Sequence, residues 1–187
     1  MSAIEIRKMS IVDADTDAVV NAANEGLWAG GGVCGAIFRA AGYDELEKAC
    51  GRIGHCDTGS AVITPGFRLK ARYIIHAVGP VWIDGLHGES GRLYDAYFNS
   101  LGLVAENDCT SVTFPLISAG IYGYPIVQAW QRALAACGDY LDKNPGRSIR
   151  IVFAVLSDEI LSAGKRALTK SKAAKYGVSQ TSGQGDF

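Results

Sequence analysis

Long apolar runs are missing from the 187-residue sequence, and no stretch approaches the roughly 20 apolar residues that cross a bilayer. The opening residues, MSAIEIRKMS, lack the apolar centre of a secretory signal peptide. We therefore expect a cytoplasmic protein with no membrane partner. An excess of either charge is missing as well, since the net charge is −1 and the isoelectric point lies near 6.3. Without a broad basic surface, a nucleic-acid partner is disfavoured.

Cysteine pairs with CxxC spacing are also absent. The sequence has five cysteines, namely Cys34, Cys50, Cys56, Cys109 and Cys137. An odd number would leave one cysteine outside any disulfide framework, so we expect reduced thiols. His55 and Cys56 lie near Cys50, but no second pair completes a four-ligand metal set. The sequence therefore predicts neither a bound metal nor a cofactor.

Glycine is abundant, and its distribution predicts shaped loops between apolar segments. The 23 glycines gather mainly in residues 26–35, 51–66, 79–91 and 118–123. Short β-branched or apolar segments predict strands at 4–7, 18–23, 61–64, 73–78, 111–117 and 149–155. Apolar residues at helical spacing predict helices near 33–41, 43–53, 93–104, 126–141 and 158–169. Strands that alternate with helices predict an α/β/α sandwich around a mostly parallel or mixed sheet.

Two of the predicted strand-to-helix junctions are rich in glycine: NEGLWAGGG after residue 23 and SAGIYGY after residue 117. Ligands of open α/β sheets bind at the carboxyl ends of strands, where free N–H groups of a helix N-terminus attract anions. Two such loops suit a diphosphate. Neither loop is GxGxxG followed by an acid, nor GxxxxGK[ST], so a Rossmann dehydrogenase and a P-loop NTPase are both disfavoured.

Three motifs, DAVVNAANEGLWAGGGVCGAIFRAAG, CDTGSAVITPGFRLKARYIIHAVGPVW and FPLISAGIYGYP, occur in that order between residues 17 and 125. With them the chain resembles the macro domain family, in its MacroD-type branch, from about Ile4 to Asp158. The resemblance implies a three-layer fold with a mixed sheet of about six strands. We expect one domain over 1–169. The polar composition of residues 170–187, which include glycine and serine, predicts a tail that is mobile or loosely packed.

The same resemblance implies a cleft for ADP-ribose or an ADP-ribosylated protein, with the diphosphate between the two glycine loops. The residues that match the first loop are Gly30, Gly31, Gly32 and Val33. Those that match the second are Ser118, Ala119, Gly120, Ile121, Tyr122 and Gly123. Asn24 matches a contact to the distal ribose, whereas Ser10 and Ile11 match the adenine end. The alternative for Asn24 is a loop asparagine that bonds to its own backbone.

Ala29 stands where the family has the first glycine of the loop, and four further positions depart from the family pattern. Ser10 stands where relatives carry an acid that accepts from adenine, and Leu156 lies near a position that many relatives fill with an aromatic residue. Cys34 and Phe38 replace the aspartate and histidine of hydrolytic relatives, at neighbouring positions of one helix. Cys34 is either a thiolate nucleophile at a helix N-terminus or a small apolar residue that packs on Phe38.

These departures leave enzyme activity open. Some relatives remove ADP-ribose from protein carboxylates or deacetylate O-acetyl-ADP-ribose, while others only bind. We expect ADP-ribose binding, with Asn24 and Cys34 as the catalytic candidates for weak hydrolase or deacetylase activity. The alternative is a non-catalytic reader of another nucleotide or of an RNA end, with relaxed adenine recognition.

Overall fold

The computed structural model describes residues 1–178. Its strands are β1 (Ala3–Lys8), β2 (Ala18–Ala23), β3 (Ala61–Pro65), β4 (Tyr73–Val78), β5 (Ser111–Phe114) and β6 (Arg150–Val155). Its α-helices are α1 (Gly32–Ala41), α2 (Tyr43–Ile53), α3 (Glu89–Glu106), α4 (Ile126–Lys143) and α5 (Asp158–Lys170). Short 3-10 helices lie at Ile11–Asp13 and Lys172–Tyr176. The predicted alternation of strands and helices is confirmed.

All six strands form one sheet in the order β1-β6-β5-β2-β4-β3. Only β3 is antiparallel to its neighbour, so the sheet is mixed and mostly parallel, as predicted. The predicted strand 111–117 is too long, because β5 ends at Phe114. Pro115, Leu116 and Ile117 leave the sheet instead and begin the second glycine loop.

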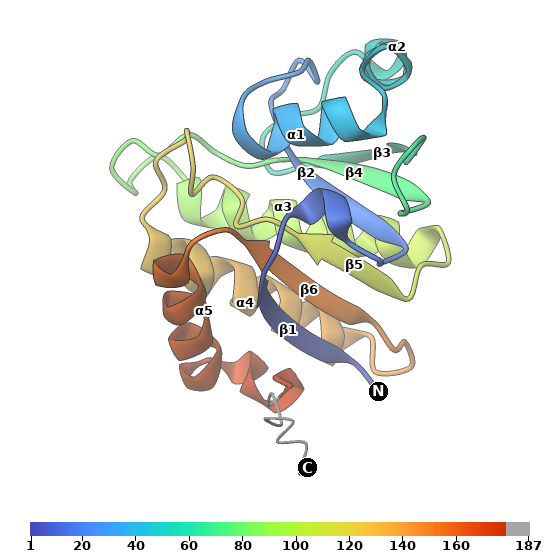
Figure 1. Ribbon diagram of the computed structural model, residues 1–187. Helices are drawn as coiled ribbons and strands as arrows, with labels where there is room; N and C mark the ends of the chain where they lie inside the picture. The colour runs from blue at the N-terminus through green and yellow to red at the C-terminus, as the bar shows by residue number, and fades with distance from the viewer. Residues whose placement is uncertain (179–187) are drawn as a thin grey trace, which may run out of the picture.

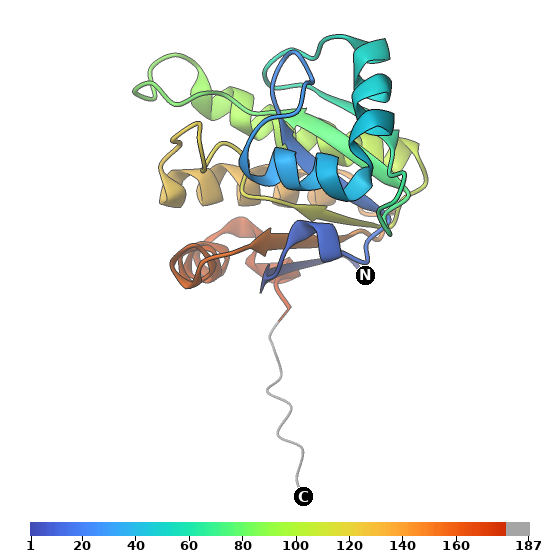
Figure 2. The same ribbon diagram turned by 45° about the horizontal axis from the view of Figure 1, so that its top comes forward.

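Helices cover both faces of the sheet, as Figures 1 and 2 show. The helices α3, α4 and α5 share one hydrophobic core with the sheet, whereas α1 and α2 share a second core on the opposite face. This arrangement is the predicted three-layer α/β/α sandwich. Because apolar residues cover the sheet on both faces, its inner strands read as almost continuous apolar runs.

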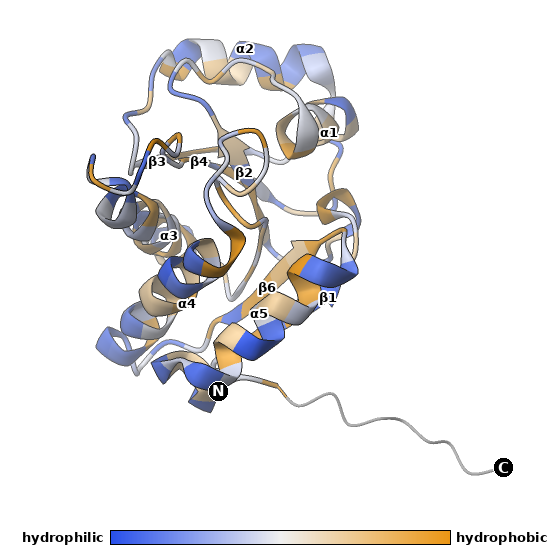
Figure 3. Cartoon of the chain, turned by 90° about the vertical axis from the view of Figure 1, so that its left-hand side faces the viewer, coloured by the Kyte–Doolittle hydropathy of each residue, from blue (hydrophilic) through white to orange (hydrophobic). Residues whose placement is uncertain are grey.

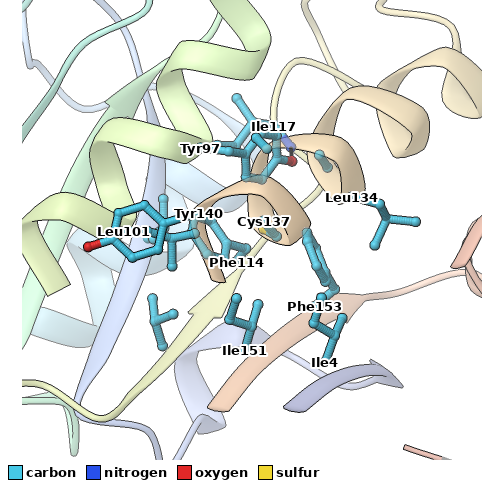
Figure 4. Close-up of a cluster of buried hydrophobic side chains, with 14 of the residues drawn as sticks. Ile4, Tyr97, Leu101, Phe114, Ile117, Leu134, Cys137, Tyr140, Ile151 and Phe153 are labelled. Carbon is cyan, nitrogen blue, oxygen red and sulfur yellow. Dashed lines mark hydrogen bonds between the residues drawn. The ribbon is translucent and has the colours of Figure 1, made fainter. Parts of the chain in front are cut away.

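Aromatic rings fill the larger core (Figure 4). The ring centroids of Tyr97 and Phe114 are 5.1 Å apart, and those of Phe114 and Phe153 are 5.7 Å apart. The Tyr97 hydroxyl accepts the N–H of Ile117 at 2.8 Å and donates to the carbonyl of Pro115 at 3.2 Å. A fully buried side chain of α3 therefore anchors the start of the second glycine loop.

The helix α5 is amphipathic, and Figure 3 shows polar and apolar segments alternating along it. Ser157 caps its N-terminus by accepting the N–H of Ile160 at 3.1 Å. A Cβ on Gly164 would lie 2.6 Å from the Trp130 ring, so a glycine lets α5 approach α4 closely. None of the helices in residues 1–178 has the length and the apolarity that a membrane crossing requires.

The segment after α5 is more ordered than expected. Residues 172–176 form a 3-10 helix in which Ala173 is 1% exposed and packs on Gly138 of α4. Lys175 and Tyr176 both contact the Asp142 carboxylate, and Gly177 forms a parallel bridge with Ile4. The expectation of a loosely packed tail is therefore wrong for residues 171–178, and the remainder of that expectation, residues 179–187, lies outside the described residues.

Candidate functional site

The carboxyl ends of the parallel strands surround a cavity of about 440 Å³. This volume lies within the range of small-molecule sites. Residues of the predicted site that line it are Ser10, Ile11, Asn24, Gly30, Gly31, Gly32, Val33, Cys34, Ser118, Ala119, Gly120, Ile121 and Tyr122. Gly123 does not line it; its φ is +70° and its N–H donates to the carbonyl of Gly120, so it closes the turn behind the cavity.

The first glycine loop ends in the N-terminus of α1. Gly32 has a φ of +58°, a left-handed conformation that favours glycine. No side chain caps α1 at Gly31, and the first N–H groups of a helix have no partner within the helix. A Cβ on Gly31 would lie 3.3 Å from Ile121 Cδ1, so the two glycine loops meet at this point. These N–H groups and the helix dipole favour an anion in the cavity.

Asn24 shapes the beginning of the first loop. Its Nδ2 donates to the Trp28 carbonyl at 2.9 Å, and its Oδ1 accepts the Trp28 N–H at 3.2 Å. These contacts match the alternative to ribose binding, in which Asn24 is a loop asparagine that bonds to the nearby backbone. The amide still has a second hydrogen on Nδ2 and a second lone pair on Oδ1, which can reach a ligand because Asn24 also lines the cavity.

Cys34 lies on the cavity wall with its sulfur in a polar environment. Its Sγ accepts the N–H of Gly30 at 3.4 Å and an N–H of the Asn21 amide at 3.6 Å. The thiol itself donates to the Trp28 carbonyl at 3.8 Å. Phe38, by contrast, does not line the cavity and packs in the core, with its ring centroid 5.7 Å from that of Tyr43. The two helical neighbours therefore face different environments.

Behind Cys34, a chain of polar groups crosses β2, β4 and β3. Asn21 Nδ2 lies 3.1 Å from His76 Nδ1, and His76 Nε2 lies 2.9 Å from Thr64 Oγ1. An amide NH₂ only donates, so His76 Nδ1 accepts and the neutral ring carries its proton on Nε2. Burial lowers the pKa of His76 to about 4. His76 is a core residue, because it is 0% exposed and both of its ring nitrogens have partners.

The second glycine loop contains an unpaired polar group. Ser118 is 5% exposed, and its Oγ finds no hydrogen-bond partner within residues 1–178. Its φ of +66° is unusual for a residue with a Cβ, and such conformations cluster at functional sites. Gly79 permits this arrangement, since a Cβ there would overlap Ser118 Oγ and lie 2.5 Å from Ile117 Cγ2. The Ser118 hydroxyl is therefore packed against Gly79 and inaccessible, while the left-handed backbone of Ser118 shapes the second glycine loop at the cavity.

The loop between β4 and α3 supports the second glycine loop from outside. The N–H of Trp82 donates to the carbonyl of Tyr122 at 2.9 Å. Glu89 holds this loop in shape, because its carboxylate accepts the N–H groups of Ile83, Asp84, Gly85 and His87 at 2.7–3.2 Å. Burial raises the pKa of Glu89, but these backbone donors outweigh burial and lower it to about 2.

Asp84, His87 and Glu89 bring their ligand atoms within 4.8 Å of one another, a grouping that the sequence reasoning missed. His87 Nδ1 lies 2.9 Å from Asp84 Oδ1. The Glu89 oxygens already accept backbone N–H groups. We therefore assign this carboxylate a structural role, which is to hold the loop between β4 and α3 in shape.

The other end of the cavity is apolar. Ile11 is buried, Leu156 is 70% exposed at the rim, and Ile160 of α5 also lines the wall. Ser10 supplies the polar side chain here; it precedes the 3-10 helix Ile11–Asp13, and its side chain makes no capping hydrogen bond. This end can hold a flat apolar group with one hydroxyl that donates or accepts.

Among residues 1–178, no lysine, arginine, histidine, aspartate or glutamate lines the cavity. The ionisable side chains on its wall are Cys34 and Tyr122, and burial raises the pKa of Tyr122, so it is neutral at pH 7. An anion would therefore be held by backbone N–H groups and neutral hydroxyls. The wall offers neither a carboxylate nor an imidazole for general acid–base chemistry.

Sequence reasoning missed the apolar part of the lining. These residues are Met9, Ala22, Ala23, Ala36, Gly79, Pro115, Leu116, Ile117, Ala154, Val155 and Ile160. Several of them end a strand or follow one directly. The rule that ligands bind at the carboxyl ends of parallel strands could have found that group.

Known proteins are similar to this chain over most of its length. A family model described as "Macro domain" matches residues 20–133. A macro domain-containing protein of Chlorobaculum tepidum is 47% identical over 161 residues, 86% of this chain and 92% of that protein. A protein of Escherichia fergusonii named O-acetyl-ADP-ribose deacetylase is 43% identical, over 90% of this chain and 97% of that one. A solved structure of the Oceanobacillus iheyensis macrodomain with ADP has a TM-score of 0.84 at 38% identity, covering 89% of this chain and 90% of that chain.

Proposed function

The chain belongs to the macro domain family, and we propose that it binds ADP-ribose, or a group that carries ADP-ribose, in the cavity at the carboxyl edge of its sheet. The observation that carries this proposal is the pair of glycine loops. The uncapped N-terminus of α1 and residues 118–122 of the second loop both border one cavity of about 440 Å³. Donors on both sides suit the two phosphates of a diphosphate.

The two ends of the cavity suit the rest of the ligand. The apolar end beside Ile11 and Leu156 has the character that a purine ring needs, with Ser10 as its polar contact. At the other end, the free hydrogen and lone pair of Asn24 suit the hydroxyls of the distal ribose. The similar macrodomain structure of Oceanobacillus iheyensis contains ADP, which supports a ligand with adenosine and a diphosphate.

Binding, with slow turnover at most, is the activity that we propose. General acid–base groups contribute ~10²–10⁴-fold to a reaction, and residues 1–178 place no carboxylate or imidazole on the cavity wall. Asn24 and Cys34 stay the candidates for chemistry, but Asn24 is engaged with Trp28. Within residues 1–178 the Cys34 sulfur contacts the Asn21 amide, the Gly30 N–H and the Trp28 carbonyl, none of which is a general base. Removal of ADP-ribose from a protein therefore depends on groups that the substrate itself supplies.

Calorimetric titration with ADP-ribose tests the proposal. We expect saturable heat with a dissociation constant below about 100 μM, which corresponds to at least about 5.5 kcal/mol. Adenosine and ribose 5-phosphate, which lack the diphosphate, should each bind at least tenfold more weakly. No heat at high micromolar ADP-ribose, or equal affinity for adenosine, would contradict the proposed site. The same sample incubated with ADP-ribosylated protein should release ADP-ribose slowly.

Ser10 favours a second candidate, a reader with relaxed base recognition. A hydroxyl donates to the carbonyl of a 6-oxopurine as readily as it accepts from the amino group of adenine, whereas a carboxylate only accepts. We expect ADP-ribose and its hypoxanthine analogue to bind within about threefold of each other. Ser10→Asp should create a preference for adenine of about tenfold or more, since hydrogen bonds to charged groups contribute about 1.5–3 kcal/mol.

The measurement is a calorimetric comparison of both ligands with both proteins. Strong adenine preference in the unaltered chain would reject relaxed recognition. An unchanged ratio in Ser10→Asp would show that the base lies away from residue 10.

A further inference from the structure

Three loops at the carboxyl edge of the sheet display apolar side chains to solvent. They are the first glycine loop (24–31), the loop between β4 and α3 (79–88) and the second glycine loop (118–123). Exposed apolar groups that gather in one place mark contact surfaces. Five of the twelve exposed large apolar side chains in residues 1–178 lie on these loops, and we call them the rim surface: Trp28, Val81, Ile83, Leu86 and Ile121.

The three loops contact one another. A Cβ on Gly31 would lie 3.3 Å from Ile121 Cδ1, which joins the two glycine loops. The N–H of Trp82 donates to the Tyr122 carbonyl at 2.9 Å, which joins the second glycine loop to the loop between β4 and α3. In Figure 1 all three loops lie at the end of the sheet where β2, β4 and β5 finish. The rim surface is therefore continuous with the mouth of the cavity.

Trp28 is held in place although it is 66% exposed. Asn24 fixes its backbone through two hydrogen bonds. Its ring lies on Gly26, where a Cβ would overlap the ring atoms. Leu27, with a φ of +59°, is 3% exposed and anchors the same turn in the core. A ring that is already held loses little conformational freedom when a partner covers it, which favours binding.

The loop between β4 and α3 is held as well. Glu89 is 2% exposed, and its carboxylate accepts four backbone N–H groups from residues 83–87. Burial of a carboxylate is costly, and here it fixes a loop whose side chains Ile83 and Leu86 are 63% and 86% exposed. The fold therefore fixes apolar groups where they face solvent, which is expected of a surface that a partner covers.

The charge on these loops is negative. Glu25 and Asp84 lie on them, and their sequence contains no lysine or arginine. Hydrogen bonds from Thr58 lower the pKa of Glu25, and a hydrogen bond from the Leu86 N–H lowers the pKa of Asp84. Both carboxylates are therefore charged at pH 7. A basic side chain over the Trp28 ring would gain from the ring and from Glu25, whereas an acidic one would be repelled.

We propose that the rim surface binds the polypeptide that carries the ADP-ribose group and selects apolar and basic residues beside the modified side chain. The inference rests on the proposed function, in which Asn24 contacts the distal ribose. A modified protein is joined to that ribose, so its chain leaves the cavity beside Asn24. The two hydrogen bonds between Asn24 and the Trp28 backbone place the rim surface next to this exit.

Calorimetry with two matched peptides tests the selection. Both peptides carry ADP-ribose on the same residue through a stable linkage, with leucine and lysine beside it in the first and glutamate in the second. The first peptide should bind about tenfold more tightly than the second, and more tightly than free ADP-ribose. Equal affinity for the two peptides, or tighter binding of the glutamate peptide, would overturn the proposal.

Trp28→Ala separates the rim surface from the cavity. It should weaken binding of the leucine–lysine peptide about tenfold and leave the affinity for free ADP-ribose within about twofold. Phe67→Ala is the matched control, since it removes an exposed ring from the turn before β4, at the opposite end of the sheet, and should bind like wild type. Where Trp28→Ala also weakens binding of free ADP-ribose, Ile83→Ser provides a second variant, with an expected loss of about threefold for the peptide alone. Losses in neither rim variant, or an equal loss in Phe67→Ala, would contradict the proposal.

Free ADP-ribose distinguishes the two possible failures. If the unaltered chain does not bind it, the proposed function fails and the inference fails with it. If the chain binds free ADP-ribose but does not discriminate between the peptides, only the role of the rim surface fails. Analytical ultracentrifugation should show a monomer. A dimer that Trp28→Ala dissociates would show that a second copy of the chain covers the rim surface, which would also overturn the proposal.

Discussion

Gly79→Ala is expected to weaken ADP-ribose binding at least tenfold. The added methyl group would overlap Ser118 Oγ and lie 2.5 Å from Ile117 Cγ2. Both side chains belong to the second glycine loop, so the loop must move away from Gly79. Ser118 already has a φ of +66°, and Tyr97 holds Ile117 by a hydrogen bond of 2.8 Å. The loop therefore cannot shift without losing the geometry that presents its donors to the cavity.

The same substitution should lower the free energy of unfolding by about 1–3 kcal/mol, the usual cost of overpacking. Thermal melting gives this cost, and calorimetry with ADP-ribose gives the affinity of the folded fraction. Gly102→Ala is the matched control, because Gly102 lies in α3 and a Cβ added there would meet no atom within 4 Å. It should leave affinity unchanged and add about 0.5–1 kcal/mol of stability. If Gly79→Ala binds ADP-ribose with an affinity within twofold of wild type, the second glycine loop does not contribute to the binding site.

Stability should fall in mild acid because of His76. Its pKa is about 4 in the folded protein against 6.5 in the unfolded chain, owing to burial. The unfolded chain therefore binds the proton first. The contribution of the neutral ring to the free energy of unfolding is fully present above pH 6.5 and is lost as the pH falls towards 4. A shift of this size corresponds to roughly 3 kcal/mol in total, of which roughly 2 kcal/mol should be lost between pH 7.5 and pH 5.

Urea unfolding at pH 7.5 and pH 5 measures this loss. His76→Gln retains an amide that can donate and accept but does not titrate, so its stability should change by about 2 kcal/mol less over the same interval. Where that variant folds poorly, the ring proton resonances of His76 in the unaltered chain provide a second readout. Titration of His76 near pH 6.5 in the folded protein would contradict the neutral, buried ring.

The fold could be predicted because its strands are short and apolar and its helices have regular apolar spacing. Residues 18–23 and 73–78 lie in adjacent buried strands, and each segment is apolar enough to be recognised alone. The site could be located because glycines follow two of these strands. Both signals are local, and neither depends on contacts between distant segments.

The parts that could not be predicted depend on distant contacts. The environment of Cys34 comes from Asn21, which is 13 positions away, and the role of Gly79 comes from Ser118. The polar segment KAAKY gave no sign of burial, yet Ala173 fits against Gly138 because neither has a bulky side chain. In the same way, the helical spacing of Cys34 and Phe38 placed them as neighbours but could not show that only Cys34 faces the cavity.

The central claim is that backbone N–H groups of the two glycine loops hold the diphosphate. A titration of isotopically labelled protein with ADP-ribose, followed by amide proton and nitrogen resonances, tests it most directly. The largest shifts should occur at Gly31, Gly32 and Val33 in the first loop and at residues 118–122 in the second. Binding with unshifted amides in both loops, or with shifts confined to other parts of the chain, would contradict the claim.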